Sequence, residues 1–149
     1  MPESPMPSPS RRALIQSGLL LCAAAVAPRA HACEFFATTL RVTHPWTRAT
    51  APDADSCIVS LKIDEVTCDD RLVGVRSPVA TGARVDGADG VDVAILAGRE
   101  TVFGDGGPTL RLVGLRHPLE IARSYPLELV FERGGPVAAT LNVDYGRFF

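Results

Sequence analysis

The stretch Arg71-Leu72-Val73-Gly74-Val75-Arg76-Ser77-Pro78 returns forty positions later as Arg111-Leu112-Val113-Gly114-Leu115-Arg116-His117-Pro118. In each copy a short apolar run is flanked by arginines and ended by a proline, which is typical of a β-strand that leads into a turn. One repetition does not make a solenoid, because stacked repeats need at least three units to bury a core. The repetition therefore predicts two similar strands within one β-sheet protein.

Around these two strands the period of two that is characteristic of β-structure dominates the chain. Apolar and polar residues alternate in the runs 57–64, 127–132 and 137–145, and no segment keeps a helical period over ten residues. About eight short strands in about a hundred residues predict an all-β domain over residues 40–143, an antiparallel sandwich with no helix beyond a turn or two. The side chains expected in its core are Val59, Leu61, Ile63, Leu112, Leu129, Phe131 and Leu141.

Residues 1–32 have the features of a cleaved export signal. Arg11-Arg12 precede a soft apolar stretch, and Ala30-His31-Ala32 matches the small-x-small pattern of a signal-peptidase site. The apolar stretch is shorter than the roughly 20 residues that span a membrane. Ser10 to Gln16 is similar to a twin-arginine signal, and an ordinary secretory leader is the alternative. Either route predicts export from a bacterial cytoplasm to the periplasm.

The expected mature chain, residues 33–149, is long enough for one domain with its own core. It carries 12 basic and 16 acidic side chains, a formal net charge of −4. This balance offers no electrostatic attraction for nucleic acid or for an anionic membrane surface. A periplasmic protein is therefore the expected kind of partner, and a membrane is expected only if Cys33 carries a lipid.

A series of short motifs, in order along residues 40–143, resembles the periplasmic copper chaperone family called PCu(A)C. These motifs are His44-Pro45-Trp46-Thr47-Arg48-Ala49, residues 70–75, Ser77-Pro78-Val79-Ala80, Ala97-Gly98, Gly106-Gly107, residues 112–115, Pro118-Leu119 and residues 125–132. The resemblance implies a cupredoxin-like Greek-key β-sandwich in the periplasm. It also implies the activity of that family, which is delivery of Cu(I) towards the copper centre of cytochrome c oxidase.

The positions at which that family binds copper carry other residues in this chain. The family pattern has a His after the Ser-Pro-Val-Ala strand, a Met in the next hairpin and a later His-x-Met pair. Reading without gaps puts Asp86 at the first His position, and Thr109 and Arg111 at the His-x-Met pair. Only eleven positions separate Asp86 from Ala97, so the hairpin that should carry the Met is shortened.

Methionine is missing from the expected mature chain altogether, because Met1 and Met6 are the only two. A carboxylate, a hydroxyl and a permanently charged guanidinium do not form a Cu(I) site, which prefers thioether, thiolate and imidazole ligands. We therefore expect no metal at this degenerate site, although copper elsewhere in the protein is possible. Since the family's ligands converge on one ion, we predict that an Asp86–Arg111 ion pair fills the vacated position.

The other polar residues of the chain show no clustered site. His44 and His117 each precede a proline and have no second ligand at metal-binding spacing, so we interpret them as strand-end or turn residues. The acidic cluster at Asp64, Glu65, Asp69 and Asp70 lacks the spacing of a calcium loop and is interpreted as a solvated turn. No nucleophile–base motif is present, so no enzymatic activity is expected.

Three cysteines, Cys33, Cys57 and Cys68, remain after the expected cleavage and would meet an oxidising compartment. If the run ending near Arg48 and the run beginning near Ser56 form a hairpin, Cys68 lies opposite about position 36. We therefore predict a Cys33–Cys68 disulfide with Cys57 as a buried free thiol. A lipid on Cys33 would exclude this bridge, and a Cys-based Cu(I) site is a further alternative because thiolates bind Cu(I) well.

Two functions are consistent with these observations. The first is an exported protein of the copper-chaperone type that handles copper or assists cytochrome oxidase assembly with its usual Cu(I) site lost or remodelled. The second is a metal-free periplasmic interaction module, in which the sandwich keeps only a docking surface. The copper stoichiometry of the purified protein under reducing conditions distinguishes them.

Overall fold

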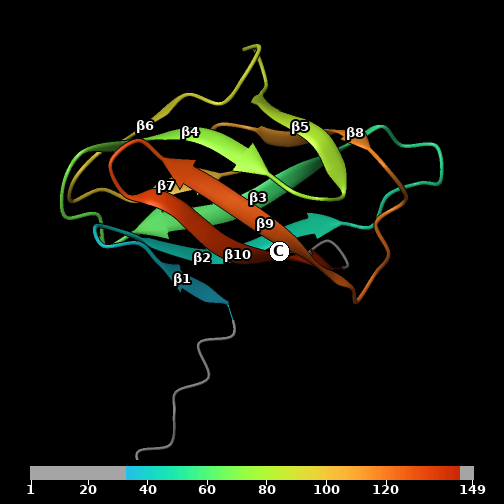
Figure 1. Ribbon diagram of the computed structural model, residues 1–149, viewed down its shortest axis with the longest axis horizontal. Helices are drawn as coiled ribbons and strands as arrows, with labels where there is room; N and C mark the ends of the chain where they lie inside the picture. Colours follow the sequence, from blue (N-terminus) through green and yellow to red (C-terminus); the bar gives the residue numbers. More distant parts are fainter. Residues whose placement is uncertain (1–32, 145–149) are drawn as a thin grey trace, which may run out of the picture. The chain divides into compact units, whose positions relative to one another are not determined.

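A computed structural model describes residues 33–144, which form ten β-strands and no helix (Figure 1). Accordingly, these residues include no helix of the length and apolar character needed to cross a membrane. The all-β prediction is confirmed. The strands are β1 (Glu34–Phe36), β2 (Arg41–Arg48), β3 (Ser56–Asp64), β4 (Asp70–Arg76), β5 (Ala80–Val85), β6 (Val93–Ile95), β7 (Thr101–Phe103), β8 (Leu110–Leu115), β9 (Ser124–Phe131) and β10 (Gly135–Asp144).

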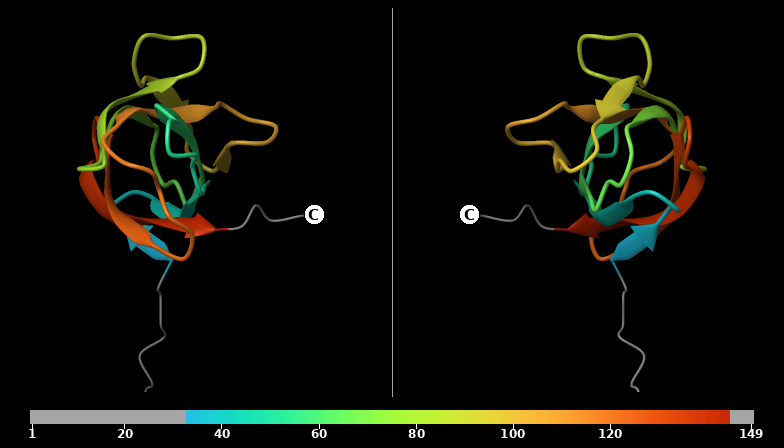
Figure 2. Two further views of the ribbon diagram at one scale, coloured as in Figure 1. Left: turned by 90° about the vertical axis from the view of Figure 1, so that its right-hand side faces the viewer. Right: turned by 90° about the vertical axis from the view of Figure 1, so that its left-hand side faces the viewer.

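The strands join into one curled sheet, whose two halves face each other across the core (Figure 2). The order along the sheet is β5-β8-β3-β2-β10-β9-β4-β6, with β1 added beside β2 and β7 added beside β3. Strand β3 belongs to both halves, because residues 56–59 pair with β8 and residues 60–64 pair with β2. A strand that changes partners along its length forms a corner between two sheets.

The direction of strand pairing follows the antiparallel expectation with one exception, the parallel pair of β2 and β10. Consecutive strands such as β9 and β10 are joined by a tight hairpin, which makes them antiparallel. No hairpin connects β2 to β10, since most of the chain lies between them. Their relative direction is therefore set by the packing of the whole domain and not by a local turn.

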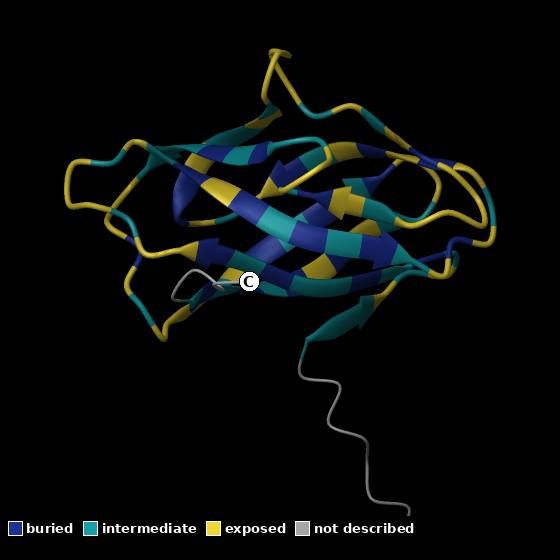
Figure 3. Cartoon of the chain, turned by 180° about the vertical axis from the view of Figure 1, so that it is seen from behind, coloured by how far each residue is buried: buried dark blue, intermediate teal, exposed yellow. Residues whose placement is uncertain are grey.

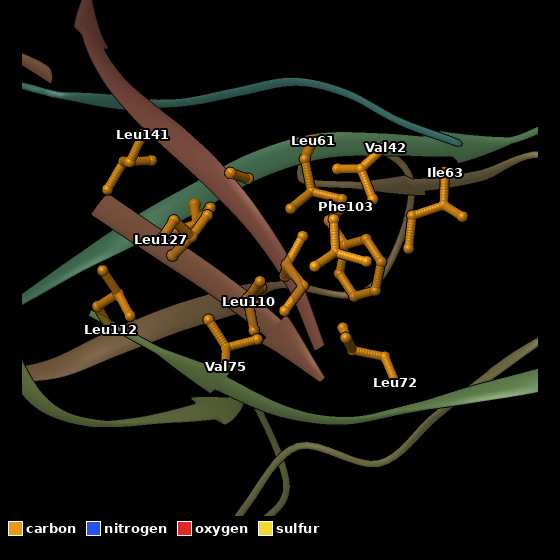
Figure 4. Packing of buried hydrophobic residues seen from close by; sticks show 14 of the residues in the cluster. Val42, Leu61, Ile63, Leu72, Val75, Phe103, Leu110, Leu112, Leu127 and Leu141 are labelled. Atoms are coloured by element: carbon orange, nitrogen blue, oxygen red, sulfur yellow. The ribbon is translucent and has the colours of Figure 1, made fainter. Parts of the chain in front are cut away.

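The core lies between the two halves of the curled sheet. Apolar side chains from most strands converge there (Figure 4), and buried positions alternate with more exposed ones along the strands (Figure 3). All seven predicted core residues are buried, namely Val59, Leu61, Ile63, Leu112, Leu129, Phe131 and Leu141. Burial of such side chains contributes about 1.5–3 kcal/mol each relative to exposure, which makes this core the main source of stability.

The two similar segments form β4 and β8, as their sequences predict, but their glycines have different surroundings. Gly114 has a positive φ of 64°, and a Cβ atom there would lie 1.9 Å from Oγ1 of Thr81 on the neighbouring β5. A Cβ atom on Gly74 would meet only the side chain of Val130, with Cβ at an ordinary 3.5 Å and Cγ2 at 3.7 Å. Only the glycine of β8 is therefore required by the backbone and by its neighbour.

Candidate functional site

Asp86 and Arg111 meet at the edge of the sheet formed by β5 and β8. Arg111 lies on β8, opposite Arg84 of β5, and Asp86 directly follows β5. The guanidinium Nε donates to Oδ1 of Asp86 and Nη2 donates to Oδ2, both at 2.9 Å. The predicted ion pair is therefore confirmed, with the two-pronged geometry that makes arginine–carboxylate pairs specific.

Thr109, the third residue at the predicted degenerate site, lies beside this pair. Its carbonyl oxygen accepts a hydrogen bond of 2.9 Å from the main-chain N–H of Asp86. Thr109 precedes β8, so it and Arg111 are two positions apart on the same side of the chain. The fold thus brings together all three positions that the sequence singled out.

The charges of the pair stabilise each other. Arg111 holds the pKa of the Asp86 carboxyl below its usual range, chiefly through the two hydrogen bonds. The same hydrogen bonds raise the pKa of Arg111 above its ordinary value. Arg84 adds a second cation at 3.7 Å from Oδ1 of Asp86. The Asp86 carboxylate is therefore ionised, and both of its oxygens interact with arginine side chains.

This set of residues does not fit a Cu(I) ion. Both carboxylate oxygens of Asp86 already accept from Arg111, and a guanidinium has donors only. Residues 33–144 also contain no cluster of three His, Cys, Asp or Glu side chains that could hold a metal. Cu(I) prefers sulfur and imidazole ligands, none of which stands at these three positions.

The predicted Cys33–Cys68 disulfide is not formed, and Cys33, Cys57 and Cys68 are all free. The prediction placed Cys33 on an extension of β2, but β1 instead folds back on β2 as a hairpin with Glu34 opposite Thr43. This hairpin places Cys33 beside His44, whose main-chain N–H donates a hydrogen bond of 2.7 Å to the Cys33 carbonyl oxygen. Cys68 stays near the other end of β2, next to Thr67, which bonds to Thr39.

Cys57 is the buried free thiol that the sequence predicts. Burial raises the pKa of its thiol, and this effect outweighs the opposing hydrogen bonds from Thr47 and from the backbone of Leu112 and the charge of Arg111. A thiol with a raised pKa is mostly protonated at neutral pH and is a poor nucleophile and metal ligand. Cys57 therefore behaves as a small core residue.

Two other interpretations need correction. Asp70 is not part of a solvated turn: it is only 4% exposed and accepts hydrogen bonds from the main-chain N–H groups of Arg71, Arg133 and Gly134. His44 lies inside β2 and not at a strand end, at a bulge where its φ is +50°. Neither feature is visible in the sequence, because both depend on contacts with distant strands.

His117 agrees with the turn interpretation. It follows β8, its Nδ1 lies 2.8 Å from the carbonyl oxygen of Pro118, and its ring contacts that of Tyr125 at a centroid distance of 5.7 Å. These contacts account for the imidazole without a metal ion.

A pocket of about 530 Å³, which the sequence did not predict, opens beside the ion pair. It lies between the end of β2 and the beginning of β3, and Thr109 and Arg111 form part of its wall. Its lining residues are Trp46, Thr47, Arg48, Ala49, Thr50, Ala54, Ser56, Cys57, Ile58, Ser60, Gly104, Asp105, Thr109 and Arg111. The sequence signal for this pocket was a set of polar and large side chains at alternate positions before and after the 49–55 turn, namely Trp46, Arg48, Ser56, Ile58 and Ser60.

Comparison with known proteins identifies related domains. Residues 40–143 match the model of the LpqE-like family, described as "Putative lipoprotein LpqE-like". The apo PCuAC domain from PmoF1 is 26% identical, with 74% of this chain and 98% of that chain covered and a TM-score of 0.69. No curated protein sequence matches the chain.

Two copper-bound structures share the fold at lower identity. The copper-bound PCuAC domain from PmoF2 is 21% identical, covers 74% of this chain and 97% of that chain, and has a TM-score of 0.69. The solution structure of CuI-DR1885 from Deinococcus radiodurans is 20% identical, with 81% and 87% covered and a TM-score of 0.58. The predicted resemblance to PCu(A)C domains is therefore confirmed.

Proposed function

The chain belongs to the LpqE-like family, and on this premise we propose that it is an exported PCu(A)C-type copper-handling protein whose usual Cu(I) position no longer holds metal. Two of the similar solved structures are described as containing bound copper. In this chain the family's ligand positions correspond to Asp86, Thr109 and Arg111. Copper handling would then use another part of the protein or assist a partner that itself carries the metal, for example in cytochrome oxidase assembly.

The observation that carries this proposal is the paired contact between Asp86 and Arg111. The Arg111 guanidinium is a fixed positive charge held against Asp86, and under this proposal it lies where a cationic metal would have to enter. Electrostatic repulsion and the lack of a soft donor both disfavour Cu(I) there. The pair adds a side-chain contact between the end of β5 and β8, which the strand pairing already joins.

Export is supported by the character of residues 1–32, which lie outside the described part of the chain, and by the family description as a lipoprotein. If the leader is removed after Ala32, Cys33 becomes the first residue and is available for lipid attachment. The free state of Cys33 in the structure is compatible with this modification. Mass spectrometry of the protein from its native membrane or periplasmic fraction tests both points.

The experiment that tests the metal proposal is a Cu(I) titration of the purified protein under reducing, anaerobic conditions, in competition with a chromogenic chelator. We expect no tight Cu(I) complex that depends on Asp86. A variant with all three described cysteines changed to serine is measured in parallel, because any copper bound by thiolates is lost in it. Tight binding at one equivalent that Asp86→Ala abolishes would show a working site and contradict the proposal.

A second candidate function, a metal-free interaction module, is favoured by the pocket beside the ion pair. The pocket lining includes Trp46, Arg48 and Ser60, which are aromatic, charged and hydroxyl side chains that are not part of the buried core. A one-equivalent Cu(I) complex that persists in Asp86→Ala and is lost with the cysteines supports the carrier. No copper binding by any variant supports the module.

A further inference from the structure

The pocket beside the ion pair is a gap between two strands of the sheet. In the described residues, pairing of β2 with β3 ends at Trp46 and Ser60. Beyond that point β2 continues beside β10 and β3 continues beside β8. The strand edges at 47–48 and 56–59 therefore face each other across the pocket without being paired to one another. Unpaired strand edges are binding sites for an additional extended chain.

One exposed arginine, Arg48, gives one end of this gap a positive charge that suits an acidic ligand. Arg48 is exposed and has no ion-pair partner among residues 33–144. Arg111, which also lines the pocket, uses Nη1 to contact Oγ of Ser56 on the β3 wall at 3.3 Å, while its other donors hold Asp86. Asp105, the one acidic side chain in the lining, lies with Trp46 and Ser60 in the wall that this pocket shares with a second, smaller pocket.

The remaining walls suit an extended peptide. Ile58 is an apolar side chain on the outer surface of β3 with 44% of its area exposed. Trp46 provides an aromatic wall opposite it, and an indole ring contacts both aliphatic side chains and peptide planes. Ser60 and Thr109 provide hydroxyl groups that can bond to a peptide backbone. The volume is within the usual range for binding pockets.

We propose that the gap between β2 and β3 binds an extended segment of a partner protein that carries an acidic side chain. The segment lies between the two strand edges, with its carboxylate beside Arg48 and an apolar side chain against Ile58 and Trp46. This inference goes beyond the proposed copper handling and is independent of its outcome, because none of the contacts involves a metal. It gives the protein a specific docking site next to the former copper position.

The test is an array of blocked hexapeptides of varied sequence and net charge, probed with the purified protein in the presence of a copper chelator. We expect peptides that contain Glu or Asp to bind best. The strongest binder is then titrated into isotope-labelled protein and followed by nuclear magnetic resonance, with the expected shift changes at residues 46–50 and 54–60. Replacing its acidic residue by the corresponding amide should weaken binding tenfold or more.

Two variants complete the test. Arg48→Ala removes an exposed side chain that the fold does not need, and it should weaken binding to the same extent as the amide peptide. Arg99→Ala removes another exposed arginine, one that does not line the pocket, and should leave binding unchanged. The proposal is overturned if no peptide binds at millimolar concentration, if Arg48→Ala binds as well as the unchanged protein, or if the shifts map elsewhere. Equal binding of free glutamate would show that no extended chain is recognised.

Discussion

Asp86 and Arg111 are 25 positions apart in the sequence, yet the two oxygens of the carboxylate accept from two nitrogens of the guanidinium at 2.9 Å each. The contact forms because β5 and β8 are paired, with Arg84 opposite Arg111. On the proposed correspondence of ligand positions, a protein cation stands here where the family would hold a metal ion.

If the ion pair has replaced a copper site, restoring the family's ligand types should restore Cu(I) binding. We predict that the triple variant Asp86→His, Thr109→His and Arg111→Met binds one equivalent of Cu(I) under reducing conditions, because two imidazoles and a thioether then converge on one point. The shortened hairpin still lacks its Met, so the affinity should be below that of complete family members.

The control for this gain of binding is the single variant Asp86→His, which adds one imidazole and leaves Arg111 in place. It should not bind Cu(I) measurably in the same competition assay. Failure of the triple variant, while its circular dichroism spectrum stays that of the unchanged protein, would argue that these positions do not form the former metal site.

Gly114 should be far less tolerant of substitution than Gly74, its counterpart in the similar segment. Gly114→Ala introduces a Cβ atom 1.9 Å from Oγ1 of Thr81 at a positive φ, so we expect a loss of about 2 kcal/mol or more in the free energy of unfolding. Gly74→Ala has ordinary contacts and should change stability by less than about 1 kcal/mol. Urea denaturation of both variants measures the difference, and equal effects would contradict it.

Asp70 should make stability depend on pH in the acidic range. Burial by itself raises the pKa of its carboxyl, but the N–H groups of Arg133, Arg71 and Gly134 outweigh this and hold the pKa below its usual range. The folded state therefore gains stability above the unfolded pKa of about 3.9 and loses it as pH falls through the lower folded value. In Asp70→Asn this loss on acidification should be reduced.

Asp70→Asn should also be less stable at neutral pH by about 1–3 kcal/mol, because the amide group turns a donor towards main-chain donors. The free energy of unfolding is measured by denaturant titration between neutral pH and about pH 3. Asp53→Asn, at an exposed position, serves as the control and should change neither quantity. If the free energy of unfolding of Asp70→Asn depends on pH in the same way as that of the unchanged protein, Asp70 is not the source of the pH dependence.

The three described thiols should differ in reactivity. Burial raises the pKa of Cys57, so at about pH 8 its thiolate fraction is small and its sulfur is shielded. We expect iodoacetamide to alkylate Cys33 and Cys68 quickly and Cys57 only after unfolding, as read by peptide mass spectrometry. If Cys33 and Cys68 resist alkylation until a reductant is added, the two residues form a disulfide and the free thiols are contradicted.

The sequence by itself determined the features that depend on local pattern and on composition. The period-two alternation specifies strands and the core positions Leu61, Leu112 and Leu129, because neighbouring side chains of a strand must point to opposite faces. The absence of methionine from residues 33–149 rules out the family's thioether ligands in any fold. Even the Asp86–Arg111 pair could be predicted, since the resemblance to PCu(A)C domains placed both residues around one ion.

Only the tertiary structure decided how segments without a local connection meet. The parallel pairing of β2 with β10 and the burial of Asp70 both depend on contacts between distant strands. No short turn sets their register, so the pattern of residues is compatible with several arrangements. The pocket between β2 and β3 has the same origin: residues 56–59 of β3, which precede Ser60, pair with β8 and not with β2.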